Sequence, residues 1–371
     1  MNDLIKKTPL YGLHLRNGAK MVDFAGFKMP IQYTSIIEEH NAVRSELGLF
    51  DLSHMGEFVI AGAGAIPYLE RMTTNNVSQL EIGQAQYTAV CNEHGGILDD
   101  CVIYRFEGHF LLVVNASNIE KVFAWFENHL SDEVSITDRS DDYSLVAVQG
   151  PRSCELLLIA AGEGTEISTL QRYRHCSATI GEVELTCART GYTGELGYEL
   201  YIEGDGAEKV WTVLAEQDVD FEVKPVGLGA RDTLRLEMRY CLYGNDIDED
   251  TNPLEAGLGW ITKLDSDDFI GCEPLRKVRA YGIDRKLVGF EISGRGIARN
   301  GYAVTANGSA IGHVTSGTHS PSLGKSIGMA YVESSYASTG NELTIDSRGR
   351  ELEAIVVETP FWKKGTATQN V

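Results

Sequence analysis

Residues 189–199 combine residue types that together suit the binding of a flat, polar ring. The segment places three glycines among two tyrosines and two glutamates. Glycine allows a tight turn in which the backbone approaches a ligand, and tyrosine offers a flat face with a polar tip. A carboxylate accepts two parallel hydrogen bonds. The segment therefore fits a planar heterocycle with adjacent N–H donors, although an ordinary glycine-rich hairpin turn accounts for the same residues.

Asp99 and Asp100 form a second candidate, because they stand between a Gly-Gly turn and an apolar run. Neighbouring side chains of a strand alternate between its two faces. If the face that carries Val102 and Tyr104 is buried, Asp100 shares it and Asp99 points the other way. The sequence offers an inward carboxylate no obvious basic partner, so Asp100 is either a satisfied structural group or a catalytic one.

A glycine-rich turn that leads into a helix is predicted for residues 224–239. Arg231, Arg235 and Arg239 follow one another at intervals of four residues, which places them on one helix face. Such a stripe fits an anionic ligand tail bound at the start of the helix. Ion pairs with carboxylates of the same helix or of a neighbouring domain explain Arg235 and Arg239 at least as well.

Short strands and a few amphipathic helices must position these residues. Ser35 and Glu38 form a capping box ahead of apolar residues at helical spacing, which predicts a helix that continues through Leu47. Further helices are predicted after a cap at Asn118 and over residues 207–216. Strands are predicted at residues 56–60, 101–106, 110–114, 144–148 and 183–188. Because no regular βαβ repeat appears, we predict an α+β fold of mainly antiparallel sheets with flanking helices.

The sequence changes its texture after about residue 282. Short apolar runs there alternate with turn dipeptides such as Asn300-Gly301, and no strong helical period appears. This pattern predicts a small C-terminal β-barrel. The charged residues 265–285 are the predicted linker.

Composition narrows the classes of partner. A chain of 371 residues exceeds what one core usually serves, so two or three domains are expected. The net charge of −21 argues against nucleic acid and anionic membranes, which are bound through excess lysine and arginine. The seven cysteines contain no C-x-x-C pair, and the nine histidines contain no H-x-H or H-x-x-x-H pattern. With no apolar run of signal-peptide length at the start, we expect a cytoplasmic monomer without a metal ion.

Motifs along the whole chain resemble one family, the aminomethyltransferases or T proteins of the glycine cleavage system. They are MVDFAGF at 21–27, FDLSHMGE at 50–57, GGILDD at 95–100, RTGYTGELGYE at 189–199, GLGARDTLRLE at 227–237, LYGNDID at 242–248 and VTSG at 314–317. Many motifs in one order are far more specific than any single motif.

The resemblance implies a three-domain cloverleaf around a central tetrahydrofolate cavity. Residues 1–52 and 143–270 would form a discontinuous folate-binding domain, residues 53–142 an α+β domain with the Asp99-Asp100 turn, and residues 282–365 the barrel. The implied partner is the lipoylated H protein. The implied reaction takes the aminomethyl group from its dihydrolipoyl sulfur, releases ammonia and gives 5,10-methylenetetrahydrofolate, a step of glycine catabolism and one-carbon metabolism.

The resemblance also assigns roles to single residues. The functional aspartate of the family falls on Asp100 and its pterin-binding carboxylate on Glu199. A preorganised carboxylate at Asp100 would stabilise the electron-poor carbon as ammonia leaves, and would orient folate N5. The other implied folate-binding positions are Tyr87, Asn115, Tyr192, Arg231 and Trp260. No C-terminal residue is assigned to the folate tail, because the sequence after Pro360-Phe361 diverges from the family pattern.

Two other functions compete with this interpretation. A folate-dependent demethylase with the same fold would act on a small methylated sulfur or nitrogen compound, and fold alone does not exclude it. A non-enzymatic folate-binding factor of iron–sulfur assembly would carry a Lys-Gly-Cys-aromatic-x-Gly-Gln-Glu segment. Here Gly271-Cys272-Glu273-Pro274 lacks the lysine, the aromatic residue and the Gly-Gln-Glu.

Overall fold

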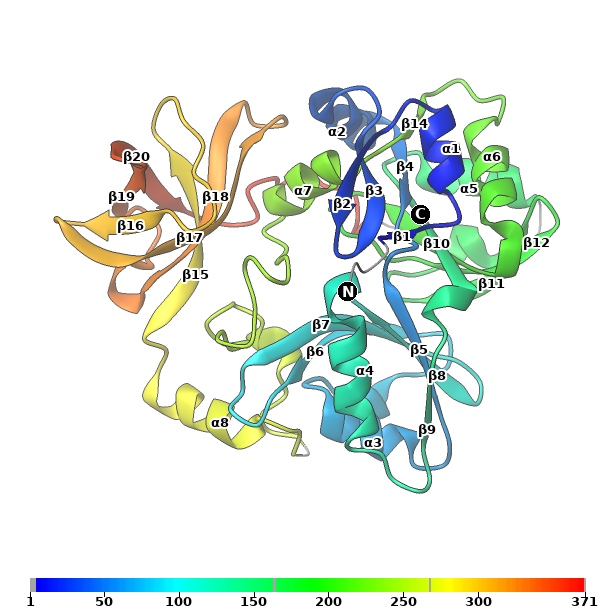
Figure 1. Ribbon diagram of the computed structural model, residues 1–371, viewed down its shortest axis with the longest axis horizontal. Coiled ribbons are helices and arrows are strands. Elements are labelled where there is room, and N and C mark those ends of the chain that lie inside the picture. The colour runs from blue at the N-terminus through cyan, green and yellow to red at the C-terminus, as the bar shows by residue number, and fades with distance from the viewer. Residues whose placement is uncertain (1–4, 163–164, 267, 370–371) are drawn as a thin grey trace.

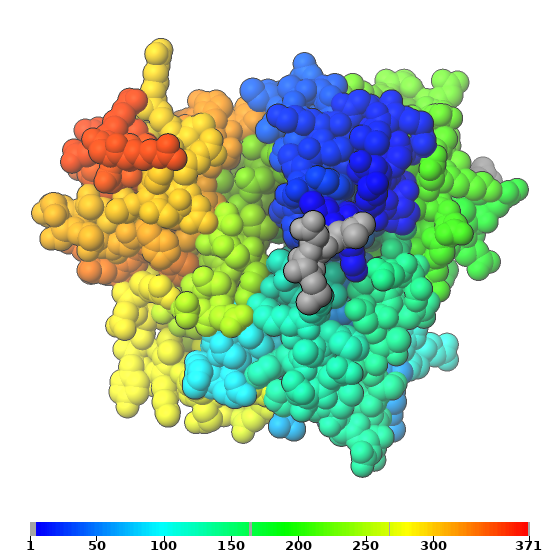
Figure 2. Space-filling view, in the orientation of Figure 1, coloured from blue at the N-terminus to red at the C-terminus, as the bar shows by residue number. Residues whose placement is uncertain are grey.

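The computed structural model describes residues 5–162, 165–266 and 268–369. Three lobes surround the centre of the molecule (Figure 1). The first lobe, at the upper right, contains a six-stranded sheet, the second, below, contains a five-stranded sheet, and the third, on the left, is a barrel. In the space-filling view, the first and second lobes meet near the middle of this face, and the barrel borders the first lobe to the left of it (Figure 2).

The first lobe is built on a six-stranded sheet. Its strands, in spatial order, are β11 (His175–Ile180), β12 (Val183–Ala188), β13 (Gly197–Glu203), β10 (Tyr143–Gln149), β4 (Leu47–Asp51) and β14 (Val223–Pro225). All neighbours are antiparallel except β14 and β4. A three-stranded sheet of β1 (Lys6–Lys7), β3 (Phe27–Gln32) and β2 (Lys20–Phe24) belongs to the same lobe.

The second lobe holds a five-stranded sheet, and the third is a closed barrel. The sheet consists of β6 (Ala85–Cys91), β7 (Ile97–Arg105), β8 (His109–Val114), β5 (Gly56–Ala61) and β9 (Ser135–Asp138). The barrel consists of β15 (Arg285–Ile292), β18 (Lys325–Glu333), β17 (Ser309–Ser320), β16 (Ala303–Ala306), β19 (Glu342–Ser347) and β20 (Arg350–Val357). The predicted α+β fold, mainly antiparallel and with a C-terminal barrel, is confirmed.

The period of two along the strands places each sheet between two cores. On β10, Val146 and Val148 face a core shared with helices α5 (Ser153–Ala161) and α6 (Ala207–Ala215). Leu145 and Ala147 face a different core, which joins the six-stranded and five-stranded sheets. On β7, Cys101 and Ile103 pack toward helices α3 (Ala65–Met72) and α4 (Ile119–Glu127). The remaining face of β7 therefore looks toward the six-stranded sheet.

Two predicted helix ends differ from the structure. Helix α2 (Ile36–Ser45) begins as predicted, because Ser35 accepts a hydrogen bond of 3.2 Å from the backbone N–H of Glu38. It stops before Leu47, which instead opens β4, a strand that pairs on both sides. Asn118 precedes α4 without capping it by its side chain, since its Nδ2 donates to Asp99 at 2.6 Å.

The remaining helices of the described chain are α1 (Tyr11–Arg16), α7 (Leu228–Glu237) and α8 (Cys272–Tyr281). Helix α8 lies within the predicted linker 265–285, so part of the predicted linker is helical. Its Cys272 and Leu275 are buried in a small core with Cys91 and Leu264. The domain boundaries drawn at residues 52, 142, 270 and 282 stay a prediction.

Candidate active site

A cavity of about 680 Å³ lies where the three lobes meet. It is lined by strands of both large sheets, by α7 and the loop that follows it, and by the barrel strands β15 and β20. The structure brings all the predicted site residues to this one cavity, namely Tyr87, Asp100, Asn115, Tyr192, Glu199, Arg231 and Trp260.

Alternation along two facing strands explains how two distant carboxylates reach the same space. Asp100 lies on the face of β7 that also carries Val102 and Tyr104, as the sequence predicts. Glu199 on β13 pairs with Ala147 and Ala188, which belong to the core between the two sheets. The two carboxylates therefore project from opposite sheets into the gap between them.

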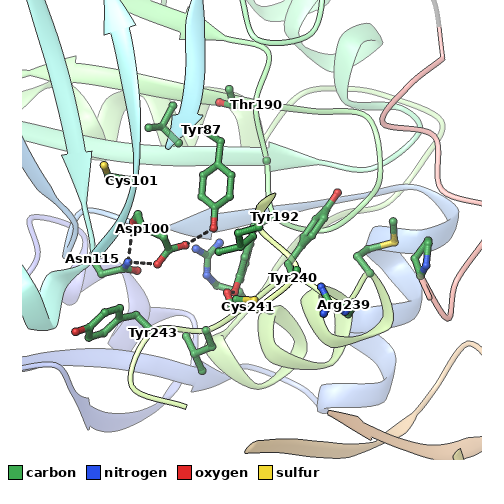
Figure 3. A pocket seen from close by; sticks show the side chains of 18 of the residues that line it. Tyr87, Asp100, Cys101, Asn115, Thr190, Tyr192, Arg239, Tyr240, Cys241 and Tyr243 are labelled. Carbon is green, nitrogen blue, oxygen red and sulfur yellow. Dashed lines mark hydrogen bonds between the residues drawn. The ribbon is translucent and has the colours of Figure 1, made fainter. Parts of the chain in front are cut away.

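Asp100 is held by two donors on either side of its carboxylate (Figure 3). The hydroxyl of Tyr87 donates to Oδ2 at 2.7 Å, and Nδ2 of Asn115 donates to Oδ1 at 2.9 Å. Within the described residues no Lys, Arg or His side chain forms an ion pair with Asp100. Its orientation is thus fixed by neutral groups, which leaves its negative charge available to a ligand.

Asp99 is also buried, although it points away from the cavity. It accepts hydrogen bonds from the backbone N–H and Nδ2 of Asn115 and from Nδ2 of Asn118, at 2.9, 2.8 and 2.6 Å. Burial raises the pKa of Asp99 to about 8, and repulsion from Asp100 raises it further, whereas the hydrogen bonds from Asn115 and Asn118 lower it. Burial also raises the pKa of Asp100, against the hydrogen bonds from Tyr87 and Asn115. The pair is therefore harder to ionise than ordinary carboxyls.

Glu199 is positioned by a chain of hydroxyl groups. Thr190 donates to its Oε2 at 2.5 Å, Tyr104 donates to the same oxygen at 3.4 Å, and Tyr201 donates to Tyr104 at 2.9 Å. No donor among the described residues bonds to Oε1. Burial raises the pKa of Glu199, while Thr190 and then Arg231 oppose the shift. Glu199 thus presents one oxygen to the cavity for the N–H groups of a ligand.

Arg231 and Tyr192 form a flat, positively charged wall. The guanidinium carbon of Arg231 lies 4.6 Å from the centroid of the Tyr192 ring, a cation–π contact. Tyr192 in turn stacks on Tyr240 at 5.7 Å with an interplanar angle of 23°. No carboxylate of the described chain pairs with Arg231, whose pKa is lowered by burial. A planar ligand that carries acceptor groups would satisfy both side chains.

The three arginines predicted on one face of α7 have different surroundings in the structure. Arg231 enters the cavity without a carboxylate partner among the described residues, whereas Arg235 is buried and pairs with Asp246 at 2.6 Å and Asp232 at 2.7 Å. Arg239 lies beyond the helix with a φ of 58° and donates to the carbonyls of Ala256 and Leu287. At the helix start, where the sequence predicts an anion site, the carboxylate of Glu39 accepts a hydrogen bond of 2.8 Å from the N–H of Gly227.

Several lining residues were missed by the sequence prediction. Tyr201 stands two positions along β13 from Glu199, so alternation was a usable signal for it. Alternation also indicates Tyr104, four positions along β7 from Asp100, which bonds to Glu199 without lining the cavity. Three lining residues other than glycine have a positive φ, namely Ala25, Tyr173 and Arg239, and such strain gathers at functional sites. Nothing in the sequence marks these three. Trp260 lines the cavity but is 60% exposed and tilted against Tyr87 at 6.0 Å, which places it at the cavity mouth.

Other site types find no support in the described residues. Across residues 5–162, 165–266 and 268–369, no group of three His, Cys, Asp or Glu side chains is placed to hold a metal ion. No helix in these ranges is long and apolar enough to cross a membrane. All seven cysteines are buried and free.

Comparison with known proteins gives concordant matches. The GCVT N-terminal domain family matches residues 10–266, and the glycine cleavage T-protein C-terminal barrel domain matches residues 285–363. The chain is 49% identical to an aminomethyltransferase from Halothermothrix orenii, over 96% of this chain and 100% of that protein. It is 47% identical to an aminomethyltransferase from Bacteroides thetaiotaomicron, over 97% and 100% of the two chains.

A solved structure agrees with the sequence matches. The crystal structure of glycine cleavage system aminomethyltransferase T from Bartonella henselae superimposes with a TM-score of 0.91 at 34% identity, over 98% of this chain and 99% of that one. The chain therefore belongs to the glycine cleavage T-protein family. The predictions of this family and of an aminomethyltransferase enzyme are confirmed, and nothing in these matches favours a demethylase or an iron–sulfur assembly factor.

Proposed function

We propose that the protein transfers the aminomethyl carbon of a lipoylated H protein to tetrahydrofolate, releasing ammonia and forming 5,10-methylenetetrahydrofolate. The observation that carries the proposal is the meeting of two half-buried carboxylates, Asp100 and Glu199, in one cavity. Their hydrogen-bond partners differ, so the two groups are suited to different tasks. One carboxylate can bind the acceptor ring while the other acts on the reacting carbon.

Glu199 is the proposed anchor of the pterin. A 2-amino-4-oxopyrimidine edge carries two adjacent N–H donors, which a carboxylate accepts in parallel. Tyr192 borders the place of the ring, and Arg231, which lies over the Tyr192 ring, offers donors to the acceptor atoms of the ligand. These contacts fix the ring and thereby place its reacting nitrogen.

Asp100 is the proposed catalytic residue. When the carbon–nitrogen bond to ammonia breaks, positive charge develops on the carbon that remains attached to sulfur. A carboxylate that Tyr87 and Asn115 already hold in place stabilises this charge without reorganising. N5 of the folate then attacks the carbon, and the carbon–sulfur bond breaks as the sulfur takes the N5 proton and leaves as the dihydrolipoyl thiol. N10 closes on the same carbon and loses its proton, which the released ammonia accepts, to give 5,10-methylenetetrahydrofolate.

The lipoyl arm needs a way into the cavity, and the exposed Trp260 beside Tyr87 supplies an apolar rim for it.

We further propose a cytoplasmic location, which the seven free cysteines support because a reducing compartment keeps thiols unpaired.

The test is product formation from aminomethylated H protein and tetrahydrofolate. Ammonia and methylenetetrahydrofolate should appear in equal amounts with the wild-type protein and far more slowly with Asp100→Asn. If the protein binds tetrahydrofolate without yielding these products, the aminomethyl transfer is refuted, and methylated sulfur and amine donors are the next substrates to assay. If it does not bind tetrahydrofolate, the whole proposal fails.

A further inference from the structure

His54 is a polar cavity residue whose hydrogen bonds are missing from the folded chain. It lies between β4 and β5, lines the cavity, and is 2% exposed. Its Nδ1 is buried with no hydrogen-bond partner among the described residues, and its Nε2 forms no hydrogen bond with any of them either. Buried polar groups are nearly always partnered. An imidazole left open at both nitrogens beside a cavity therefore calls for a partner that the cavity receives.

The ring of His54 is held in one orientation by aromatic neighbours. Phe24 packs against it edge-to-face with centroids 5.6 Å apart and planes at 81°, and Phe27 does so at 6.4 Å and 63°. Both phenylalanines belong to the β2–β3 hairpin, whose turn residue Ala25 also lines the cavity with a φ of 47°. The hairpin tip thus covers His54, and the polar edge of the ring is set in advance of binding.

The charge state of His54 suits a neutral partner. Burial lowers the pKa of His54 to about 4, and the nearby charge of Arg231 adds to the shift. At neutral pH the imidazole is therefore uncharged, and it offers one N–H donor and one nitrogen acceptor. Because the two nitrogens point in diverging directions, one of them can meet a single N–H or carbonyl group on a ligand edge, such as the edge of a tetrahydropterin ring.

Arg231 locates the part of the ligand that His54 would meet. Arg231, His54 and Glu199 all line the same cavity, and the charge of Arg231 acts on the other two side chains. We propose that His54 is a positioning residue that hydrogen-bonds the edge of the bound tetrahydropterin ring. This inference rests on the proposed function, in which Glu199 binds the aminopyrimidinone edge.

The test separates the ring nitrogens of His54 from its volume. His54→Phe keeps a flat ring and removes both nitrogens, whereas His54→Asn and His54→Gln return an amide near Nδ1 and Nε2, respectively. His109→Phe is the matched control, because His109 stacks on Phe106 at 4.7 Å outside the cavity lining. Tetrahydrofolate affinity is measured by calorimetry, with Michaelis constants for tetrahydrofolate and for H protein alongside.

The expected result is a roughly 10-fold weaker tetrahydrofolate affinity for His54→Phe, the scale of one lost hydrogen bond at a buried site. One of the two amide variants should recover most of that loss, while His109→Phe and the Michaelis constant for H protein stay unchanged. Unchanged affinity in His54→Phe, or a loss that neither amide repairs, would show that the ring only packs. Failure of the wild-type protein to bind tetrahydrofolate would instead remove the proposed function, and this inference with it.

A measurement on the wild-type protein covers the case in which His54→Phe does not fold. The ¹⁵N signals of the His54 ring, assigned by their loss in His54→Gln or His54→Asn, should shift when tetrahydrofolate is added. The signals of His14, which is buried and bonded to Asp51 and Tyr33, should not move. A His54 signal that stays in place on saturation would overturn the inference.

Discussion

Replacement of Asp100 by asparagine should lower turnover without lowering stability. The raised pKa of Asp100 means that its ionised form is disfavoured in the folded protein, chiefly by burial. A neutral amide of the same shape removes that unfavourable term and still accepts the hydrogen bond from Tyr87. We therefore expect a melting temperature equal to that of the wild-type protein or higher, as is typical when a functional charge is removed from an active site.

The turnover of Asp100→Asn should fall, although its melting temperature should not. Removal of one preorganised electrostatic group costs about 10² to 10³ in rate, or roughly 3 to 4 kcal/mol of transition-state stabilisation. Tetrahydrofolate affinity should change little, because Asp100 and the pterin anchor Glu199 project from different sheets. The combination of lost rate, kept affinity and kept stability identifies a charge that acts on the reaction itself.

The assay is a single turnover of aminomethylated H protein with tetrahydrofolate in excess, together with thermal unfolding and calorimetry. Glu358→Gln is the matched control, because Glu358 also lines the cavity but is exposed and pairs with Lys363 at 3.3 Å. Its rate should stay within about twofold of the wild-type rate, since screened surface charges contribute little. A rate for Asp100→Asn within threefold of wild type would refute the catalytic role, and a clear drop in melting temperature would refute the stability argument.

Three further changes test other parts of the structure. Glu199→Ala should weaken tetrahydrofolate binding by about 2–4 kcal/mol, because two ligand donors lose their acceptor, and an unchanged calorimetric affinity would exclude Glu199 from the site. Burial raises the pKa of Glu237 but His40 and Arg44 outweigh it, and the pKa falls from 4.5 to about 2. Stability from Glu237 is thus present above pH 4.5 and lost as the pH falls toward 2, so Glu237→Gln should lower stability by about 3 kcal/mol at pH 6 and far less near pH 2; equal differences at both pH values in urea unfolding would contradict this. Gly197→Ala should cost about 1–3 kcal/mol, because a Cβ there would lie 2.3 Å from Oε1 of Gln149, and thermal unfolding that matches wild type would show that the loop adapts.

The sequence predicts which face of a strand a site residue lies on better than it predicts which distant residues meet in the cavity. Alternation along β7 places Asp100 on the inward face together with Val102 and Tyr104, and the structure agrees. For residues 189–199, residue types alone favour a hairpin turn over a ligand loop. The loop does connect two antiparallel strands, β12 and β13, so both descriptions hold for part of it. The resemblance to a family was needed to choose Glu199 from its two glutamates.

Long-range partners explain the failed prediction of a helix cap and two residues to which the sequence assigned no role. Asn118 has the residue type of a helix cap, yet its amide donates to Asp99, a residue 19 positions earlier. Glu195 belongs to the ligand-like segment, but it is buried and pairs with Arg44 at 2.7 Å. His54 stands in a family motif and carries no local signal of its own. In each case the deciding contact joins elements that only the folded chain brings together.

Buried arginines distinguish structural charges from functional ones in this protein. Arg44 pairs with Glu195 and Glu237, and Arg235 pairs with Asp246, so each of these two cations meets a carboxylate inside the fold, whereas the buried Arg189 donates to the carbonyl of Leu170. Arg231 is half-buried, and no carboxylate of the described residues pairs with it, although Glu199 lines the same cavity. Leaving an arginine and a carboxylate apart in one cavity forgoes an interaction that folding alone would favour. A bound ligand that carries both donors and acceptors would explain the separation. Its donors would then bond to Glu199 and its acceptors to Arg231, in place of a bond between the two side chains.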